Sequence, residues 1–226
     1  SESTGLFSLF EKQSDDFIFG ENKYVSILCG IDEFLVQREY ASRGFGWLLR
    51  LDDRLFEDKL NKLKDTIGKV LCTWCNFSAF KTVEEKIQAA KWALEYDRNA
   101  WDIVYEALPN QYASAFGEIY QPRYRQHSET SSVMYTEMCE VVDAYIDLLT
   151  KKADFKPGRW NKLLEMADEL SEENRTKVFE TMLYEVSQMS DYEKLQLKDS
   201  IRKVIYKHRY FSAATWAMNE EILKDY

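Results

Sequence analysis

The chain has 226 residues, of which 45% are hydrophobic and 31% are charged, a composition typical of a folded protein. Only 8 glycines and 3 prolines occur, which argues against a β-sandwich or barrel and against a Gly-rich nucleotide-binding fold. The formal net charge of -9 argues against non-specific nucleic-acid binding, because that binding needs a basic surface.

Two further absences in the sequence bear on the compartment. No run of about 18 apolar residues occurs, so we expect no membrane span. The polar start, Ser1–Thr4, has no apolar signal segment, so we expect the four cysteines to be free thiols in the reducing cytoplasm. The chain lacks an initiator Met and stops directly after an apolar helix face, so we expect it to be a fragment of a larger protein.

The first half of the chain has the apolar period of helices after a mixed lead-in over residues 1–20. From Asn22, apolar side chains recur at spacings of three and four, as on one face of a helix. Gly44-Phe-Gly46 indicates a bend or a close helix contact. Thr82-Val-Glu-Glu85 has the spelling of a capping box that opens a helix, and a short helix follows and ends at Pro109.

Residues 109–129 form the one long break in this helical pattern. The break contains Pro109 and Pro122, two of the three prolines in the chain. Loops longer than roughly 12–15 residues are uncommon in compact domains and are usually functional or disordered. We therefore expect this loop to be the most informative segment.

The second half returns to the helical period. The stripe from Val133 to Leu149 is the clearest in the chain, and Pro157 lies where the first turn of a helix tolerates proline. Ser171 is expected to open the next helix, and Ser190-Asp-Tyr-Glu193 is a second capping box. A last helical segment is expected from Trp216 to Leu223, capped by Thr215.

These patterns predict an all-α fold of roughly ten helices of about 10–20 residues. Short connections favour antiparallel helix pairs stacked as an α-solenoid or a layered helical array. No strict sequence period supports a named repeat. We expect residues 1–226 to form a single helical domain, with a sub-division into 1–108 and 130–226 around the loop 109–129 as the alternative.

Catalytic and metal-binding patterns are weak in this sequence. Cys72-Thr-Trp-Cys75 has the C-x-x-C spelling, but it lacks a βαβ context and a second ligand pair, and we expect buried thiols in a helical stripe. His208 lies near a helix C-terminus, where a cation suits the helix dipole. The other histidine, His127, would need a nucleophile brought to it in space. We therefore expect no catalytic residue, no metal site and no cofactor.

The loop carries the best candidate for a binding surface. Tyrosine and arginine are enriched at interface hot spots, and arginine can also bind a carboxylate or phosphate. The alternative is that these arginines tie the loop to acidic helices of the same chain. The predicted partner-binding residues are Tyr120, Arg123, Tyr124, Arg125 and His127.

Several landmarks together resemble a helical region of very large bacterial proteins. They are Phe17–Gly20, Arg38–Arg43, Trp47–Asp52, Ala100–Pro109, Pro122–Arg125, Arg159-Trp160, Arg175, Lys207–Phe211 and Trp216. On these residues the chain resembles STAND-type and sirtuin-linked antiviral sensor proteins. It departs from that pattern at Lys59–Phe80. There the family's pattern has a segment containing proline and tryptophan, and this chain has Cys72-Thr-Trp-Cys75 instead.

The resemblance implies a scaffold or sensor segment and carries over no catalytic residue. We expect a non-enzymatic segment that mediates protein–protein interaction or signal transmission in the bacterial cytoplasm, with a role in phage defence. Its expected partners are other modules of the parent polypeptide and a phage or other protein ligand, without nucleic acid or membrane. The alternative is a small-ligand-binding or hydrolytic helical domain with its site at the 109–129 loop.

Overall fold

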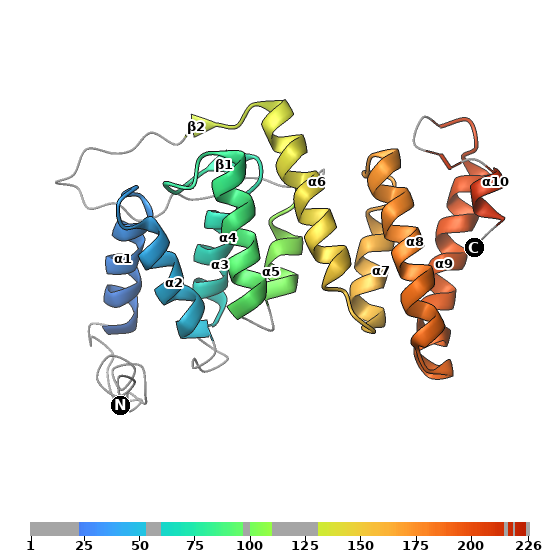
Figure 1. Cartoon of the computed structure of the whole chain (residues 1–226), viewed down its shortest axis with the longest axis horizontal. Helices are drawn as coiled ribbons and strands as arrows, with labels where there is room; N and C mark the ends of the chain where they lie inside the picture. The colour runs from blue at the N-terminus through green and yellow to red at the C-terminus, as the bar shows by residue number, and fades with distance from the viewer. Residues whose placement is uncertain are drawn as a thin grey trace, which may run out of the picture. The chain divides into compact units, whose positions relative to one another are not determined.

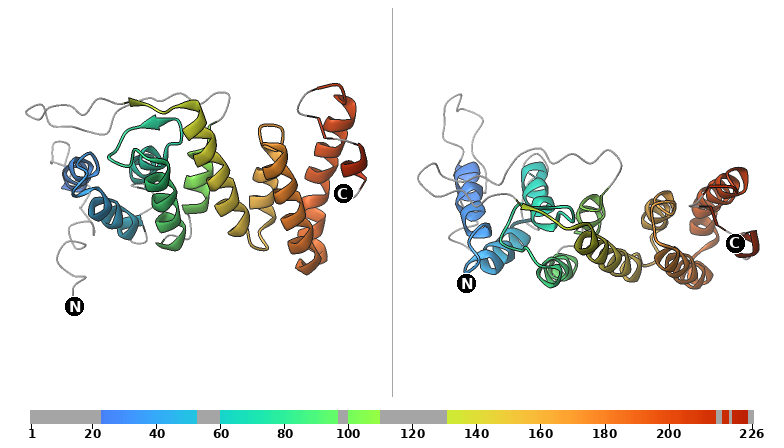
Figure 2. Two further views of the ribbon diagram at one scale, coloured as in Figure 1. Left: turned by 45° about the horizontal axis from the view of Figure 1, so that its top comes forward. Right: turned by 90° about the horizontal axis from the view of Figure 1, so that it is seen from above.

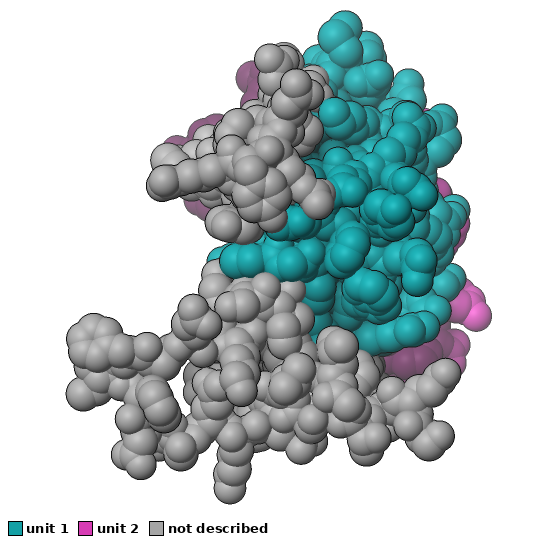
Figure 3. All heavy atoms as spheres, turned by 90° about the vertical axis from the view of Figure 1, so that its left-hand side faces the viewer, with its two compact units in different colours: residues 1–145 teal, residues 146–226 magenta. Residues whose placement is uncertain are grey.

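The computed structural model describes residues 23–52, 60–96, 100–109, 131–214, 217–218 and 220–224 (Figure 1). Helices make up most of these residues, and the strands among them are two residues long each. The predicted all-α class is confirmed. The chain divides into two compact units, residues 1–145 and residues 146–226, which Figure 3 distinguishes by colour. The predicted alternative boundary, at the loop 109–129, falls mostly on residues outside the described ranges and stays a prediction.

Within its described residues, unit 1 contains five helices, a strand pair and the start of a sixth helix. Its elements are α1 (Lys23–Leu35), α2 (Ala41–Asp52), α3 (Leu60–Leu71), β1 (Cys75–Asn76), α4 (Val83–Tyr96), α5 (Ala100–Glu106), β2 (Ser131–Ser132) and the first part of α6 (Tyr135–Lys151). Helix α2 packs against α1, α3 and α4, and α3 packs against α5 (Figure 2). The strands pair antiparallel, with Cys75 opposite Ser132.

The core of unit 1 is made of apolar side chains from its helices. Burial of apolar side chains is the main favourable term in folding, at about 25 cal/mol per Å² removed from water. The fully buried large side chains of this unit include Leu28, Leu35, Phe45, Leu48, Leu63, Ile67, Trp101 and Tyr145. The predicted capping box opens α4: the Thr82 hydroxyl accepts the Glu85 N–H at 3.2 Å, and the Glu85 carboxylate accepts the Thr82 N–H at 3.1 Å.

Unit 2 holds the end of α6 and four further helices. They are α7 (Pro157–Glu165), α8 (Glu172–Gln188), α9 (Asp191–Tyr210) and α10 (Glu220–Leu223). Pro157 lies in the first turn of α7, Ser171 caps α8, and Ser190 with Glu193 forms a full capping box on α9, all as predicted. Helix α7 packs against α9, and Trp160 lies buried at the centre of this unit.

Two local predictions were wrong. Cys72 and Cys75 do not continue a helical stripe: α3 ends at Leu71, and Cys75 belongs to the strand β1, which pairs with β2. The expected helix from Trp216 to Leu223 is only the four-residue α10, and residues 217–218 are not helical. In both places a contact outside the helix replaces the next helical turn: Cys75 pairs with Ser132, and the Met218 N–H donates to His208. Thr215 and Trp216 themselves lie outside the described residues.

The two glycines of α2 differ in their surroundings. A Cβ added at Gly44 would lie 2.9 Å from the Phe34 Cβ of α1, whereas a Cβ at Gly46 would meet nothing within 4 Å. Gly44 therefore marks the close helix contact that the sequence indicated. Gly46 has no such role.

We predict that Gly44→Ala destabilises the protein by about 1–2 kcal/mol, because the clash at α1 outweighs the gain in helix propensity. The matched control, Gly46→Ala in the same helix, is expected to stabilise by about 0.5–1 kcal/mol. Urea unfolding followed by circular dichroism measures both variants. Equal stability of the two variants would show that the α1–α2 approach is not constrained.

Candidate functional site

The predicted partner-binding loop cannot be placed. Tyr120, Arg123, Tyr124, Arg125 and His127 all lie outside the described residues. Their role stays a prediction. The described residues contain three other features that deserve a functional interpretation: a buried lysine in unit 1, a buried histidine in unit 2, and an exposed aromatic face on α9.

The buried lysine is Lys86 on the first turns of α4, whose side chain and backbone together are 1% exposed. Its ammonium donates hydrogen bonds to the carbonyl oxygens of Cys72 and, at 3.1 Å, of Cys75. These carbonyls follow the C-terminus of α3, where no further helical turn supplies N–H donors. Lys86 therefore acts as a cap on α3 from a neighbouring helix.

Two hydroxyls complete this arrangement. The Tyr145 hydroxyl of α6 lies 3.1 Å from the Leu71 carbonyl and 3.2 Å from the Lys86 carbonyl, and it can donate to either. The Thr73 hydroxyl donates to the Ala107 carbonyl at 3.1 Å. Helices α3, α4 and α6 and the end of α5 are thus joined through one buried set of polar groups. We call Lys86, Tyr145, Thr73 and the carbonyls that they contact the Lys86 cluster.

Burial sets the protonation of this cluster. It lowers the pKa of Lys86 to about 8, so the side chain is still an ammonium at pH 7. It raises the pKa of both Cys72 and Cys75, so these thiols stay protonated and are poor nucleophiles at neutral pH. The predicted free cysteines are confirmed, since all four cysteines are thiols. The chemistry of the cluster is that of a structural cap.

We predict that Lys86→Met destabilises the protein by about 1–3 kcal/mol, because the carbonyls of Cys72 and Cys75 lose their buried donor. The matched control is Lys91→Met, on the exposed side of the same helix, with an expected change within about 0.5 kcal/mol. The urea unfolding midpoints of the Lys86→Met and Lys91→Met variants measure the two changes in stability. A Lys86→Met variant as stable as Lys91→Met would remove the capping role.

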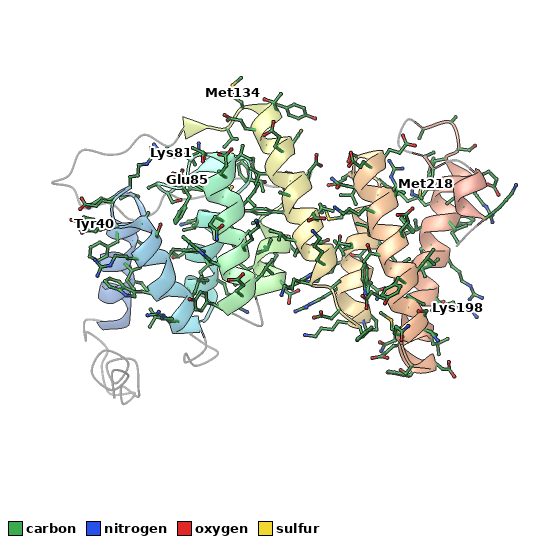
Figure 4. The ribbon with its side chains drawn as sticks, viewed as in Figure 1. Tyr40, Lys81, Glu85, Met134, Lys198 and Met218 are labelled. Atoms are coloured by element: carbon green, nitrogen blue, oxygen red, sulfur yellow. The ribbon has the colours of Figure 1, made fainter. Side chains whose placement is uncertain are left out.

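The buried histidine of unit 2 is His208, in the last turn of α9. Its Nδ1 accepts the backbone N–H of Met218 at 3.1 Å, and its Nε2 lies 3.2 Å from the Asp168 Oδ1. The other oxygen of Asp168 pairs with the Lys207 ammonium. Figure 4 shows Met218 among the side chains at this end of the unit.

This geometry defines one tautomer of His208. Because Nδ1 accepts a hydrogen bond, the proton of the neutral ring is on Nε2 and faces Asp168. Burial lowers the pKa of His208, which the Asp168 carboxylate opposes and the cations Arg175 and Lys207 reinforce. The sequence interpretation of His208 as a dipole-facing cation is therefore wrong. The ring is neutral at pH 7, and it holds the segment before α10 to α9.

We predict that His208 titrates below pH 6.5 and that its Nε2-protonated form dominates at pH 7. The pKa of His208 is lower in the folded state than in the unfolded state. When the pH falls below about 6.5, protonation of His208 therefore stabilises the unfolded state relative to the folded state, and unit 2 loses stability. Nitrogen-15 NMR of the imidazoles measures the titration, and the variant His127→Gln assigns the signals, since the chain has 2 histidines. A midpoint at or above 6.5 contradicts the prediction.

A small cavity of about 190 Å³ lies between α7 and α9 in unit 2. Its lining mixes charges with apolar groups: Leu164, Glu165, Asp168, Ser200, Lys203, Val204 and Lys207. The carboxylate of Asp168 is already engaged by His208 and Lys207. One carboxylate and one ammonium of the lining, Asp168 and Lys207, are therefore already paired with each other.

The exposed face of α9 is the third feature. We call it the α9 stripe and define it by Tyr192, Leu195, Tyr206, Tyr210 and, directly after the helix, Phe211, all of which are exposed. Tyr206 and Tyr210 are 69% and 68% exposed, and their rings stack at 5.9 Å. The edge of Phe211 meets Tyr210 at 4.8 Å. Tyr206, Tyr210 and Phe211 form a ridge of aromatic surface at the end of a helix whose opposite side faces the core.

Sequence reasoning missed the α9 stripe, although the signal was present. The tyrosines at 192, 206 and 210 are separated by 14 and 4 residues, which returns them to one face of a helix. An apolar stripe on each of two opposite faces is the pattern that would have identified the surface.

No family model, curated protein or solved structure matches the chain. Across the described residues, no group of three or more His, Cys, Asp or Glu side chains is arranged to hold a metal ion. None of the helices within the described ranges is both long enough and apolar enough to cross a membrane. Function must therefore be inferred from the three features above.

Proposed function

We propose that this chain is a non-catalytic helical scaffold or sensor segment that works through protein–protein contacts. The observation that carries the proposal is the α9 stripe. Large contiguous apolar patches on a protein surface mark interaction sites, and the contacting rings of Tyr206, Tyr210 and Phe211 are the contiguous part of the stripe. Tyrosine is also enriched among the residues that dominate binding energy at interfaces.

The buried histidine and the buried lysine support a non-catalytic role. A catalytic base or nucleophile needs a free lone pair or a reactive amine directed at a substrate. Both ring nitrogens of His208 are already engaged, and the Lys86 ammonium is bound by two carbonyls. Their shifted pKa values follow from structural burial.

The helix contacts support the further proposal of an α-solenoid made of stacked helix pairs. In such arrays each helix contacts the helix two positions along, in the next pair. Within unit 1, α2 contacts α4 and α3 contacts α5, and within unit 2, α7 contacts α9. A single array over residues 1–226 is part of this proposal.

The resemblance to STAND-type and sirtuin-linked antiviral sensors suggests where such a segment acts. We propose that it belongs to a large bacterial cytoplasmic protein and connects an effector module to a recognition module, or contacts a phage protein. The loop residues Tyr120, Arg123, Tyr124, Arg125 and His127 are a second proposed contact surface. The alternative, a small-ligand or hydrolytic site at the 109–129 loop, has its residues outside the described ranges.

The α9 stripe as an interaction surface is tested by site-specific photo-crosslinking in the cells that produce the protein. We predict that a photoreactive phenylalanine analogue in place of Tyr206 gives covalent adducts of discrete mass with another protein. The physical reason is that a crosslinker at the centre of an interface lies within a few ångströms of the partner. Denaturing gels and mass spectrometry measure the adducts.

The matched control places the same analogue at Tyr96, which is 53% exposed at the end of α4. We expect no discrete adduct there. If position 206 gives no adduct, or if positions 96 and 206 give the same set, α9 is not the interaction surface.

A further inference from the structure

We propose that the α9 stripe binds an acidic amphipathic helix of another protein. The inference rests on the proposed function and specifies the chemistry of the partner. Two properties lead to it. The stripe has the shape of one helix face, and the net charge of helix α9 is opposite in sign to that of the chain as a whole.

The stripe is narrow and straight. At 100° per residue, Tyr192, Leu195, Tyr206 and Tyr210 fall within an arc of about 60°. The buried Leu197 and His208 lie on the opposite side of α9. A surface of this shape fits the apolar seam of a second helix lying along α9, as in helix-on-helix packing.

The stripe has two anchor regions. Tyr192 and Leu195 occupy the start of the helix, and the stacked Tyr206 and Tyr210 with Phe211 occupy its end. With a rise of 1.5 Å per residue, the two regions are separated by about 21 Å. Between them the face is polar and holds the Asp199–Arg202 pair. A matching helix therefore carries two apolar clusters about four turns apart.

Charge selects an acidic partner. In α9 Lys and Arg outnumber Asp and Glu by six to three, whereas the chain has a net charge of -9. Lys198, labelled in Figure 4, lies with Arg202 and Arg209 along one flank of the stripe, and all three are exposed. Arg202 also pairs with Asp199 and Arg209 with Glu220, both at exposed positions. Lys203 lies at the other flank. Charge complementarity of this kind steers association and suppresses wrong partners.

The aromatic geometry favours a protein over a single-stranded nucleic acid. Nucleic-acid platforms present open ring faces on which bases stack. In the α9 stripe, Tyr206 and Tyr210 already cover one face of each other, with ring planes 20° apart, and Phe211 lies against Tyr210. The rings act as a ridge for packing against side chains. The overall acidity of the chain adds to this preference.

The test uses the full 226-residue chain and three fluorescent probes. The first is a designed amphipathic helix with two apolar clusters spaced as above and Glu on the flank that would face Lys198 and Arg202. The second is the same peptide with every Glu replaced by Lys, and the third is an oligouridylate. We expect the acidic peptide to bind about tenfold or more tighter than the basic one, with affinity falling as salt rises, and no binding of the oligouridylate. Fluorescence anisotropy measures all three.

Two variants locate the site. Tyr206→Ala combined with Tyr210→Ala is expected to weaken binding of the acidic peptide by about tenfold or more, whereas Tyr96→Ala leaves it unchanged. Lys198→Glu combined with Arg202→Glu is expected to remove the preference for the acidic peptide. Circular dichroism confirms that each variant keeps its helix content, which is expected because all the substituted side chains are exposed.

The outcomes separate this inference from the proposed function. Equal binding of the acidic and basic peptides, or no binding of either, overturns the acidic partner, while crosslinking at position 206 would still support an interaction surface. Binding of the oligouridylate that is lost in the double tyrosine variant overturns it in favour of nucleic acid. Unchanged peptide binding in that variant places the site elsewhere and overturns the inference outright.

Discussion

The buried end of α3 is the constraint on which unit 1 depends. A helix leaves its last carbonyls without N–H partners, and burying them unpaired would cost more than most single packing contacts contribute. Helix α3 ends inside the protein, so donors must come from elsewhere: the Lys86 ammonium from α4 and the Tyr145 hydroxyl from α6. The requirement explains why a lysine is buried at 1% exposure in a helical core. It also places α4 and α6 around the C-terminus of α3.

Unit 2 solves a similar problem with different groups. The backbone between α9 and α10 is not helical at residues 217–218, and the N–H of Met218 is buried there with His208 as its acceptor. The same ring reaches Asp168 after α7, so one side chain ties three segments together. In both units a buried ionisable side chain, Lys86 or His208, forms a hydrogen bond with the backbone. These groups are thus used within the fold, and the proposed interaction surface, the outer face of α9, is made of other side chains.

Sequence reasoning succeeded where the determinants are local and failed where they are distant. The capping boxes at Thr82 and Ser190 and the first-turn Pro157 were predictable, because each depends on residues within three or four positions. The close helix contact at Gly44 was predictable only in part. The sequence shows the glycine, but it does not show that Phe34 lies against it. The C-terminus of α3 and the start of α10 were not predictable from local sequence. After α3 the chain pairs with Ser132 in a strand, and before α10 the Met218 N–H donates a hydrogen bond to His208. The loop site could be named from residue types alone, but its contacts could not.

Helix α9 shows why periodicity alone gives an incomplete prediction. A surface helix normally has one apolar stripe and an opposite polar face. In α9 the opposite face carries tyrosines, and the charges are displaced to the flanks of that face as Lys198, Arg202 and Arg209. Flanking cations disfavour the pairing of α9 with α9 of a second copy, because like charges repel each other. The same cations leave the stripe open to a helix of opposite charge. The selectivity for an acidic partner that we propose is thus consistent with the arrangement of side chains on α9.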